Sequence, residues 1–159
     1  MSVRTSQLQW AAADPTERIL RLTVHDDDGL PEAALVEAGL DATNAAVAAL
    51  RNVRPLLVFA REQAETVIGG AVGRTWGECC ELRQLWVADS HRRCGLGTRL
   101  VREVERSAME RGCRLLYLET FSFQAKPFYE KLGYKVAAEI KGFENGIVKY
   151  LMTRDLRSE

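Results

Sequence analysis

The chain has 159 residues, with 22 basic and 22 acidic side chains and a formal net charge of zero. This length predicts a single domain over residues 1–159, and the balanced charge argues against a dedicated nucleic-acid binder, whose affinity comes from many uncompensated phosphate contacts. The apolar stretches are much shorter than the roughly 20 residues that span a bilayer, so we expect no membrane partner.

Predicted strands and helices follow one another along the whole chain. Alternating apolar and polar residues predict a first strand at 18–24, and an alanine-rich stretch predicts two short helices within 31–52, broken near Gly39. Three glycines indicate that a strand at 66–76 is bent or bulged. Further strands are predicted at 56–60, which is expected to be buried, and at 78–87, 115–121, 134–140 and 148–153.

The strongest helical pattern follows Gly95 and ends near Gly112. Its apolar residues recur on one face and its charged residues lie mostly off that face, as in an amphipathic helix. A shorter helix is predicted at 124–132 and is stopped by Gly133. With antiparallel hairpins at both ends and one strand–helix–strand crossover between them, the pattern predicts an α+β or mixed α/β fold.

The loop between the strand at 78–87 and the amphipathic helix is the best candidate for a ligand site. Gly95 and Gly97 lie where the helix begins, and a helix N-terminus exposes unpaired N–H groups and a partial positive charge that bind phosphate. Arg92 and Arg93 add full charges, and residues 89–114 contain seven arginines against four acidic residues. The pattern predicts an anion site; a glycine-rich helix entry without a ligand is the structural alternative.

Two nucleotide motifs and a metal site are weaker interpretations. The Walker loop requires Gly-Lys followed by Ser or Thr, which the chain lacks, and the dinucleotide fingerprint would need a third glycine where Leu100 stands. A zinc site made of Cys79, Cys80, His91 and Cys94 lacks the ligand spacing of structural zinc sites. We therefore expect no metal.

Three segments resemble the GCN5-related N-acetyltransferase (GNAT) family. Arg92, Gly95 and Gly97 fit its R/Q-x-x-G-x-G/A motif for the acyl-CoA pyrophosphate, and the strand at 81–87 is similar to the family's fourth strand. The segment 125–134 is similar to its A-x-x-(F/L)-Y-E-K-L-G-(F/Y) pattern. The motifs come in the family's order and spacing, and the resemblance covers most of the chain.

The resemblance implies a GNAT-like, mostly antiparallel sheet of six to seven strands, splayed between the fourth and fifth strands and flanked by about four helices. It also implies acetyl-CoA as co-substrate, with backbone groups of Leu85 and Val87 on the pantetheine arm. Ser122 stands where the family often has an Asn that positions the cofactor, which is the one departure. The implied cofactor-binding residues are Leu85, Trp86, Val87, Arg92, Arg93, Cys94, Gly95, Leu96, Gly97, Thr98, Ser122, Ala125 and Phe128.

Direct acetyl transfer from a thioester to an amine requires a neutral amine and a proton for the leaving thiolate. Tyr129 matches the family's general acid, with a core aromatic as its structural alternative. Glu81 matches the spacing of the glutamate base in the histone-acetyltransferase branch, and strand alternation places it on the face of Leu85 and Val87. A surface ion pair is the structural alternative for Glu81. Glu78 is a second candidate base, and either carboxylate can act through water.

The expected function is acetylation of a primary amine, on a small molecule as first choice and on a protein lysine or N-terminus as second. A non-catalytic acyl-CoA sensor and a cysteine-dependent hydrolase using Cys94 or Cys79 are the other classes, and the presence of Tyr129 and Glu81 argues against the sensor. A homodimer is left open. Because the N-terminal residues lack a signal-peptide pattern and no C-x-x-C pair is present, we expect a cytoplasmic protein with reduced thiols.

Overall fold

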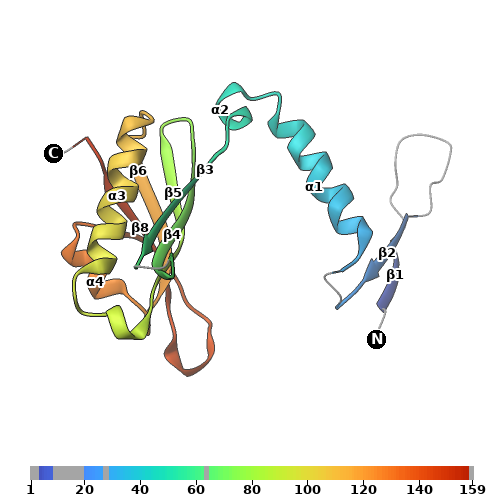
Figure 1. The fold of residues 1–159 in the computed structure, drawn as a ribbon. Helices are drawn as coiled ribbons and strands as arrows, with labels where there is room; N and C mark the ends of the chain where they lie inside the picture. The colour runs from blue at the N-terminus through green and yellow to red at the C-terminus, as the bar shows by residue number, and fades with distance from the viewer. Residues whose placement is uncertain (1–3, 9–19, 27–28, 63–64, 158–159) are drawn as a thin grey trace. The chain divides into compact units, whose positions relative to one another are not determined.

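The computed structural model describes residues 4–8, 20–26, 29–62 and 65–157, which fall into two compact units (Figure 1). The first unit ends at Ala46 and the second begins at Val47. In the first unit, β1 (Arg4–Leu8) pairs with β2 (Leu20–Val24) as antiparallel strands, and α1 (Pro31–Asn44) follows. Strand β2 confirms the described part of the strand expected at 18–24, whereas β1 was not predicted.

Helix α1 runs straight through Gly39, where the sequence suggested a break. A single glycine keeps its backbone N–H and costs a helix only about 1 kcal/mol relative to alanine. The Thr43 hydroxyl also donates a hydrogen bond to the Gly39 carbonyl at 3.1 Å. The helix ends at Asn44, and the short helix α2 (Ala48–Arg51) follows in the second unit. The two helices are therefore confirmed, but the predicted position of the break was wrong.

The second unit is built on a six-stranded sheet in the order β3-β4-β5-β6-β8-β7. All neighbouring pairs are antiparallel except β5 with β6, which confirms the mixed α/β fold with a mostly antiparallel sheet. Strand β3, expected to be buried, forms an edge of this sheet, where Pro55 is tolerated and only Leu56 is buried. The strands are β3 (Arg54–Arg61), β4 (Val67–Trp76), β5 (Cys79–Val87), β6 (Leu115–Phe121), β7 (Lys135–Ile140) and β8 (Lys149–Asp155).

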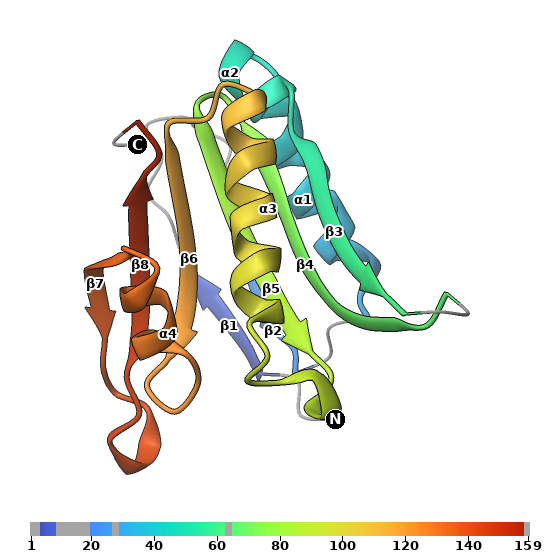
Figure 2. The same cartoon turned by 60° about the vertical axis from the view of Figure 1, so that its left-hand side comes forward.

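Helix α3 (Leu96–Glu110) covers one face of this sheet, across β3, β4 and β5 (Figure 2). Its residues Leu100, Val101 and Val104 are buried, and they join the buried side chains of β6 in one core. Burial of each such side chain contributes about 1.5–3 kcal/mol. The predicted amphipathic helix is confirmed, and its buried face fixes the position of the loop before it.

Helix α4 (Lys126–Lys131) belongs to the same core, because Tyr129 is buried within it. Among the described residues, none of the helices has the length and apolar character needed to cross a lipid bilayer.

Strands β5 and β6 pair over only part of their length. Residues 79–82 pair with residues 115–118 in parallel, and the pairing ends there. Beyond Leu82, β5 is paired with β4 alone. This separation is the splay that the resemblance implied between the family's fourth and fifth strands.

A β-bulge lies in β5 next to the point where it leaves β6. Leu82 pairs with Gly73 of β4, whereas Gln84 pairs with Val72, so Arg83 is the extra residue. A bulge bends a strand and changes the direction of its side chains.

Strand β4 has a bulge of its own, because Gly69 pairs with Ala60 and Val67 with Arg61, which leaves Ile68 as an extra residue. The bend or bulge expected in the strand at 66–76 is therefore confirmed.

Candidate active site

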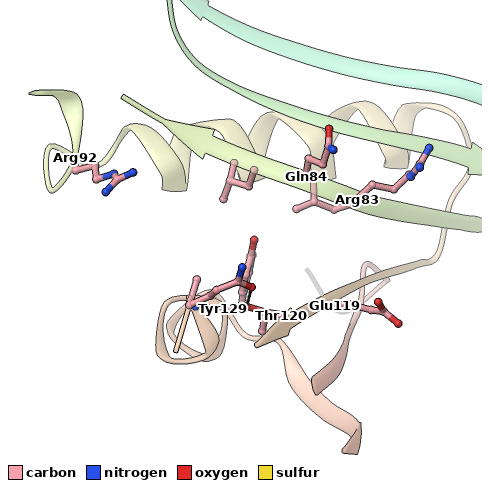
Figure 3. A pocket seen from close by; sticks show the side chains of 10 residues that line it. Arg83, Gln84, Arg92, Glu119, Thr120 and Tyr129 are labelled. Carbon is pink, nitrogen blue, oxygen red and sulfur yellow. Dashed lines mark hydrogen bonds between the residues drawn. The ribbon is translucent and has the colours of Figure 1, made fainter. Parts of the chain in front are cut away.

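A cavity of about 690 Å³ lies where β5 and β6 separate (Figure 3). Arg92 lies at one end, and Arg83 and Glu119 lie toward the other. One wall consists of Leu82, Arg83, Gln84, Leu85 and Arg92, and the other of Glu119, Thr120, Gln124, Ala125 and Tyr129. Because the edge of β5 beyond Leu82 has no strand partner on this side, its N–H and C=O groups are available to a ligand.

The loop 92–98 leads from β5 into α3 and has two unusual backbone conformations. Gly95, the residue before the helix, has a φ of 83°, which glycine adopts at little cost. Arg93 has a φ of 63°. No side chain caps the helix at Gly95, so the first N–H groups of α3 are open to an anion.

Positive charge is concentrated around this loop rather than along α3. Arg93 and Arg99 are exposed, and in the described part of the chain their side chains have no ion pair. Farther along the helix, Arg106 pairs with both Glu103 and Glu110. Arg93 and Arg99 are therefore available to an anionic ligand at the helix N-terminus.

Arg92 links the loop to the end of β5. Its guanidinium forms a salt bridge with Asp89 at 2.8 Å, and its Nε donates a hydrogen bond to the Val87 carbonyl at 3.1 Å. Together with the open helix N-terminus and the unpartnered edge of β5, this arrangement fits a ligand with a phosphate end and an extended, amide-containing arm.

Tyr129 presents the only phenol among the described residues that line the cavity. Its side chain is 6% exposed, and its ring packs edge-on against Phe128 and Tyr134, with centroid distances of 5.0 and 5.6 Å. Burial raises the pKa of Tyr129 to about 12, so the phenol keeps its proton at neutral pH. Within the described chain its hydroxyl has no hydrogen-bond partner, so this proton is available to a ligand.

A buried ionic network holds the segment that carries Tyr129. Glu105 of α3 is 3% exposed and accepts hydrogen bonds from the Tyr134 hydroxyl at 2.9 Å and from Arg154 at 3.1 Å. Arg154 also donates to the carbonyl of Leu132 at 2.6 Å. The network joins α3, β8 and the end of α4.

Glu81 lies on the wrong face of β5 for the predicted arrangement. Because Arg83 is an extra residue, the alternation shifts by one, and Leu85 and Val87 pack against the core under α3. Glu81 points from the opposite face and accepts a hydrogen bond from Arg74 Nε at 2.6 Å. The expectation that Glu81 shares a face with Leu85 and Val87 was therefore wrong.

Glu78, the second candidate base, forms a salt bridge with Arg114 at 3.2 Å. Both side chains are more than half exposed, and neither lines the cavity.

Gln124 lines the cavity, whereas Ser122, which was expected to contact the cofactor, does not. The Ser122 hydroxyl accepts a hydrogen bond from the Val148 N–H at 3.2 Å and does not line the cavity. Gln124 does line it, and its side-chain oxygen accepts from the Phe121 N–H at 3.0 Å. This leaves the Gln124 amide nitrogen as the nearby donor.

The predicted cofactor and catalytic residues are only partly brought together. Those that line the cavity are Leu85, Arg92, Ala125 and Tyr129. Phe128 lies against the loop, since a Cβ on Gly97 would come within 3.5 Å of its ring. Those outside the lining are Glu81, Trp86, Val87, Arg93, Cys94, Gly95, Leu96, Gly97, Thr98, Ser122 and Phe128.

The lining residues that sequence reasoning missed are Leu82, Arg83, Gln84, Glu119, Thr120 and Gln124. They cluster around the point where β5 and β6 stop pairing. This point depends on contacts between residues far apart in the sequence, so the local sequence indicates it only weakly. The glycines of β4 predicted a bulge in that strand, but not the bulge at Arg83 of β5 that borders the cavity.

None of the four cysteines is among the described residues that line the cavity. Cys80 is buried in the core, while Cys94 is exposed and its Sγ donates to the His91 carbonyl at 2.8 Å. The His91 ring lies 3.1 Å from a Glu62 carboxylate oxygen. Among the described residues, no three His, Cys, Asp or Glu side chains are grouped to hold a metal ion.

Known proteins are similar to this chain in both sequence and fold. The Acetyltransferase (GNAT) family model matches residues 28–134. A blasticidin-S acetyltransferase from Streptomyces morookaense is 38% identical over 108 residues, which are 65% of this chain and 79% of the relative. The crystal structure of an acetyltransferase from Bacillus cereus is 26% identical with a TM-score of 0.72, covering 83% of this chain and 97% of that one. The aminoglycoside 6′-N-acetyltransferase from Enterococcus faecium is 25% identical with a TM-score of 0.56, covering 65% of this chain and 73% of that one. This chain therefore belongs to the GNAT family of acetyltransferases, whose co-substrate is acetyl-CoA.

Proposed function

We propose that this acetyltransferase moves the acetyl group of acetyl-CoA directly to a primary amine of a small molecule, in the cavity between β5 and β6. The observation that carries the proposal is that one cavity has Arg92 at its end and the protonated Tyr129 phenol on its wall. Two similar proteins support the acceptor class, because they are named as acetyltransferases of small molecules, one of blasticidin-S and the other of aminoglycosides.

The loop and the edge of β5 would hold the co-substrate. The N-terminal amides of α3, with Arg93 and Arg99 beside them, provide the charge for a pyrophosphate. The unpartnered edge of β5 after Leu82 offers backbone groups to the pantetheine arm, and Gln124 offers a side-chain amide from the facing wall. Binding through backbone groups positions the arm without a large number of specific side chains.

Tyr129 would act as the general acid. Acetyl-CoA supplies the acetyl group as an activated thioester, and the Tyr129 hydroxyl donates its proton to the departing sulfur. Glu81 would accept the amine proton only through water, because it pairs with Arg74 on the other face of β5. We further propose that residues 1–159 form one acetyltransferase domain in the cytoplasm, supported by a family match that includes residues of both units.

A panel of amines tests the proposed acceptor class. We expect release of free coenzyme A that requires both acetyl-CoA and a small-molecule amine, with little release on peptides that carry a lysine or a free N-terminus. Release with the peptides alone would contradict the small-molecule assignment. Release with none of the amines or peptides would contradict amine acetylation itself.

A further inference from the structure

The two arginines that line the cavity have different surroundings. Arg92 is tied to Asp89 and to the Val87 carbonyl. The side chain of Arg83 is exposed, and within the part of the chain that the structure describes it has neither an ion pair nor a hydrogen bond. The residues that line the cavity therefore include an arginine whose guanidinium has unused hydrogen-bond donors.

The fold directs Arg83 to this position through the bulge. Arg83 is the extra residue between Leu82 and Gln84, and it follows the last residue of β5 that pairs with β6. Bulges near active sites re-aim a side chain out of the regular alternation. A regular strand would leave no extra residue at the point where the cavity opens.

The acidic residues near this end of the cavity already have cationic partners. Glu119 on the facing wall forms a salt bridge with Lys149, and Glu81 forms one with Arg74. Figure 3 shows Arg83 and Glu119 toward the end away from Arg92, so this end is separate from the expected phosphate end. Its unmatched charge is positive, which fits an anionic group on the ligand.

We propose that Arg83 binds a carboxylate of the acceptor, so that the preferred substrates are amines that also carry a carboxylate. This inference rests on the proposed function and narrows its acceptor class. The planar guanidinium can give two parallel hydrogen bonds to a carboxylate, which positions the acceptor as well as binding it. A simple alkyl amine has no group for this contact.

Matched pairs of acceptors test the assignment: amino carboxylic acids and their carboxamides, assayed by coenzyme A release. In the wild type we expect the KM of the carboxylate to be lower by about tenfold to a hundredfold, the usual range for a hydrogen bond to a charged group. Arg83→Gln should raise the carboxylate KM to that of the carboxamide and leave the acetyl-CoA KM unchanged, and Arg83→Lys should restore part of the preference.

Arg114→Gln is the matched control, because it removes the same charge from an exposed arginine outside the cavity. It should leave both acceptor KM values unchanged. Equal KM values in the wild type, or a preference that survives Arg83→Gln, would overturn the role of Arg83. So would a rise in the acetyl-CoA KM in place of the acceptor KM. Absence of release with either member of every pair would instead contradict the proposed function.

Discussion

Tyr129→Phe is expected to lower kcat by about a hundredfold or more while leaving the dissociation constant for acetyl-CoA nearly unchanged. The substitution removes only the phenolic oxygen, which has no hydrogen-bond partner among the described residues. The ring contacts with Phe128 and Tyr134 are retained, so the fold should be preserved. Steady-state kinetics with a verified acceptor and calorimetric titration with acetyl-CoA measure the two quantities.

Tyr150→Phe is the control, because this tyrosine lies on β8 outside the cavity lining and also keeps its ring packing. It should leave kcat unchanged. The pH profile gives a second readout: burial raises the pKa of Tyr129 to about 12, so kcat should not fall near pH 10, where an ordinary tyrosine is half ionised. An unchanged kcat in Tyr129→Phe would remove the tyrosine from the mechanism.

Glu105→Gln is expected to lower the free energy of unfolding by about 3 kcal/mol, the effect of removing one charge from a buried ion pair. Glu105 is 3% exposed and interacts with Arg102, Arg154 and Tyr134. Removing its charge leaves the buried Tyr134 hydroxyl and the nearly buried Arg154 guanidinium without the carboxylate that they share. Urea unfolding followed by circular dichroism measures the change.

Glu103→Gln is the matched control on the same helix. Glu103 pairs with Arg106 at the surface, where ion pairs contribute little to stability. This variant should unfold at nearly the wild-type urea concentration. Equal losses in the two variants would contradict a special role for the buried network.

Much of the second unit could be predicted because its signals are local. The apolar face of α3 repeats with helical spacing, and Gly95 and Gly112 mark its ends.

Helix α1 of the first unit shows the limit of such local signals, because a glycine that suggests a break is tolerated when the residues around it favour the helix. Pairing partners are not local, and β1, recognised only through its pairing with β2, was missed.

In the candidate site, too, the parts that depend on local sequence could be predicted and the parts that depend on strand pairing could not. The anion loop could be predicted because a strand end, two glycines and a helix start are adjacent in sequence. The face of Glu81 could not be predicted, because one extra residue at Arg83 reverses the alternation in the remainder of β5. The facing wall with Glu119 and Gln124 depends on where β5 and β6 stop pairing, which follows from packing across the sheet rather than from either strand alone.

The proposed function requires that acetyl-CoA binds in the cavity between β5 and β6, with the loop before α3. Thermal unfolding with and without acetyl-CoA tests it most directly, because a ligand at a hundred times its dissociation constant adds about 2.7 kcal/mol to the free energy of unfolding. For a chain of this size we expect a rise in Tm of about 5–10 °C, retained in Tyr129→Phe. No rise in Tm at millimolar acetyl-CoA would contradict acetyl-CoA binding by this chain.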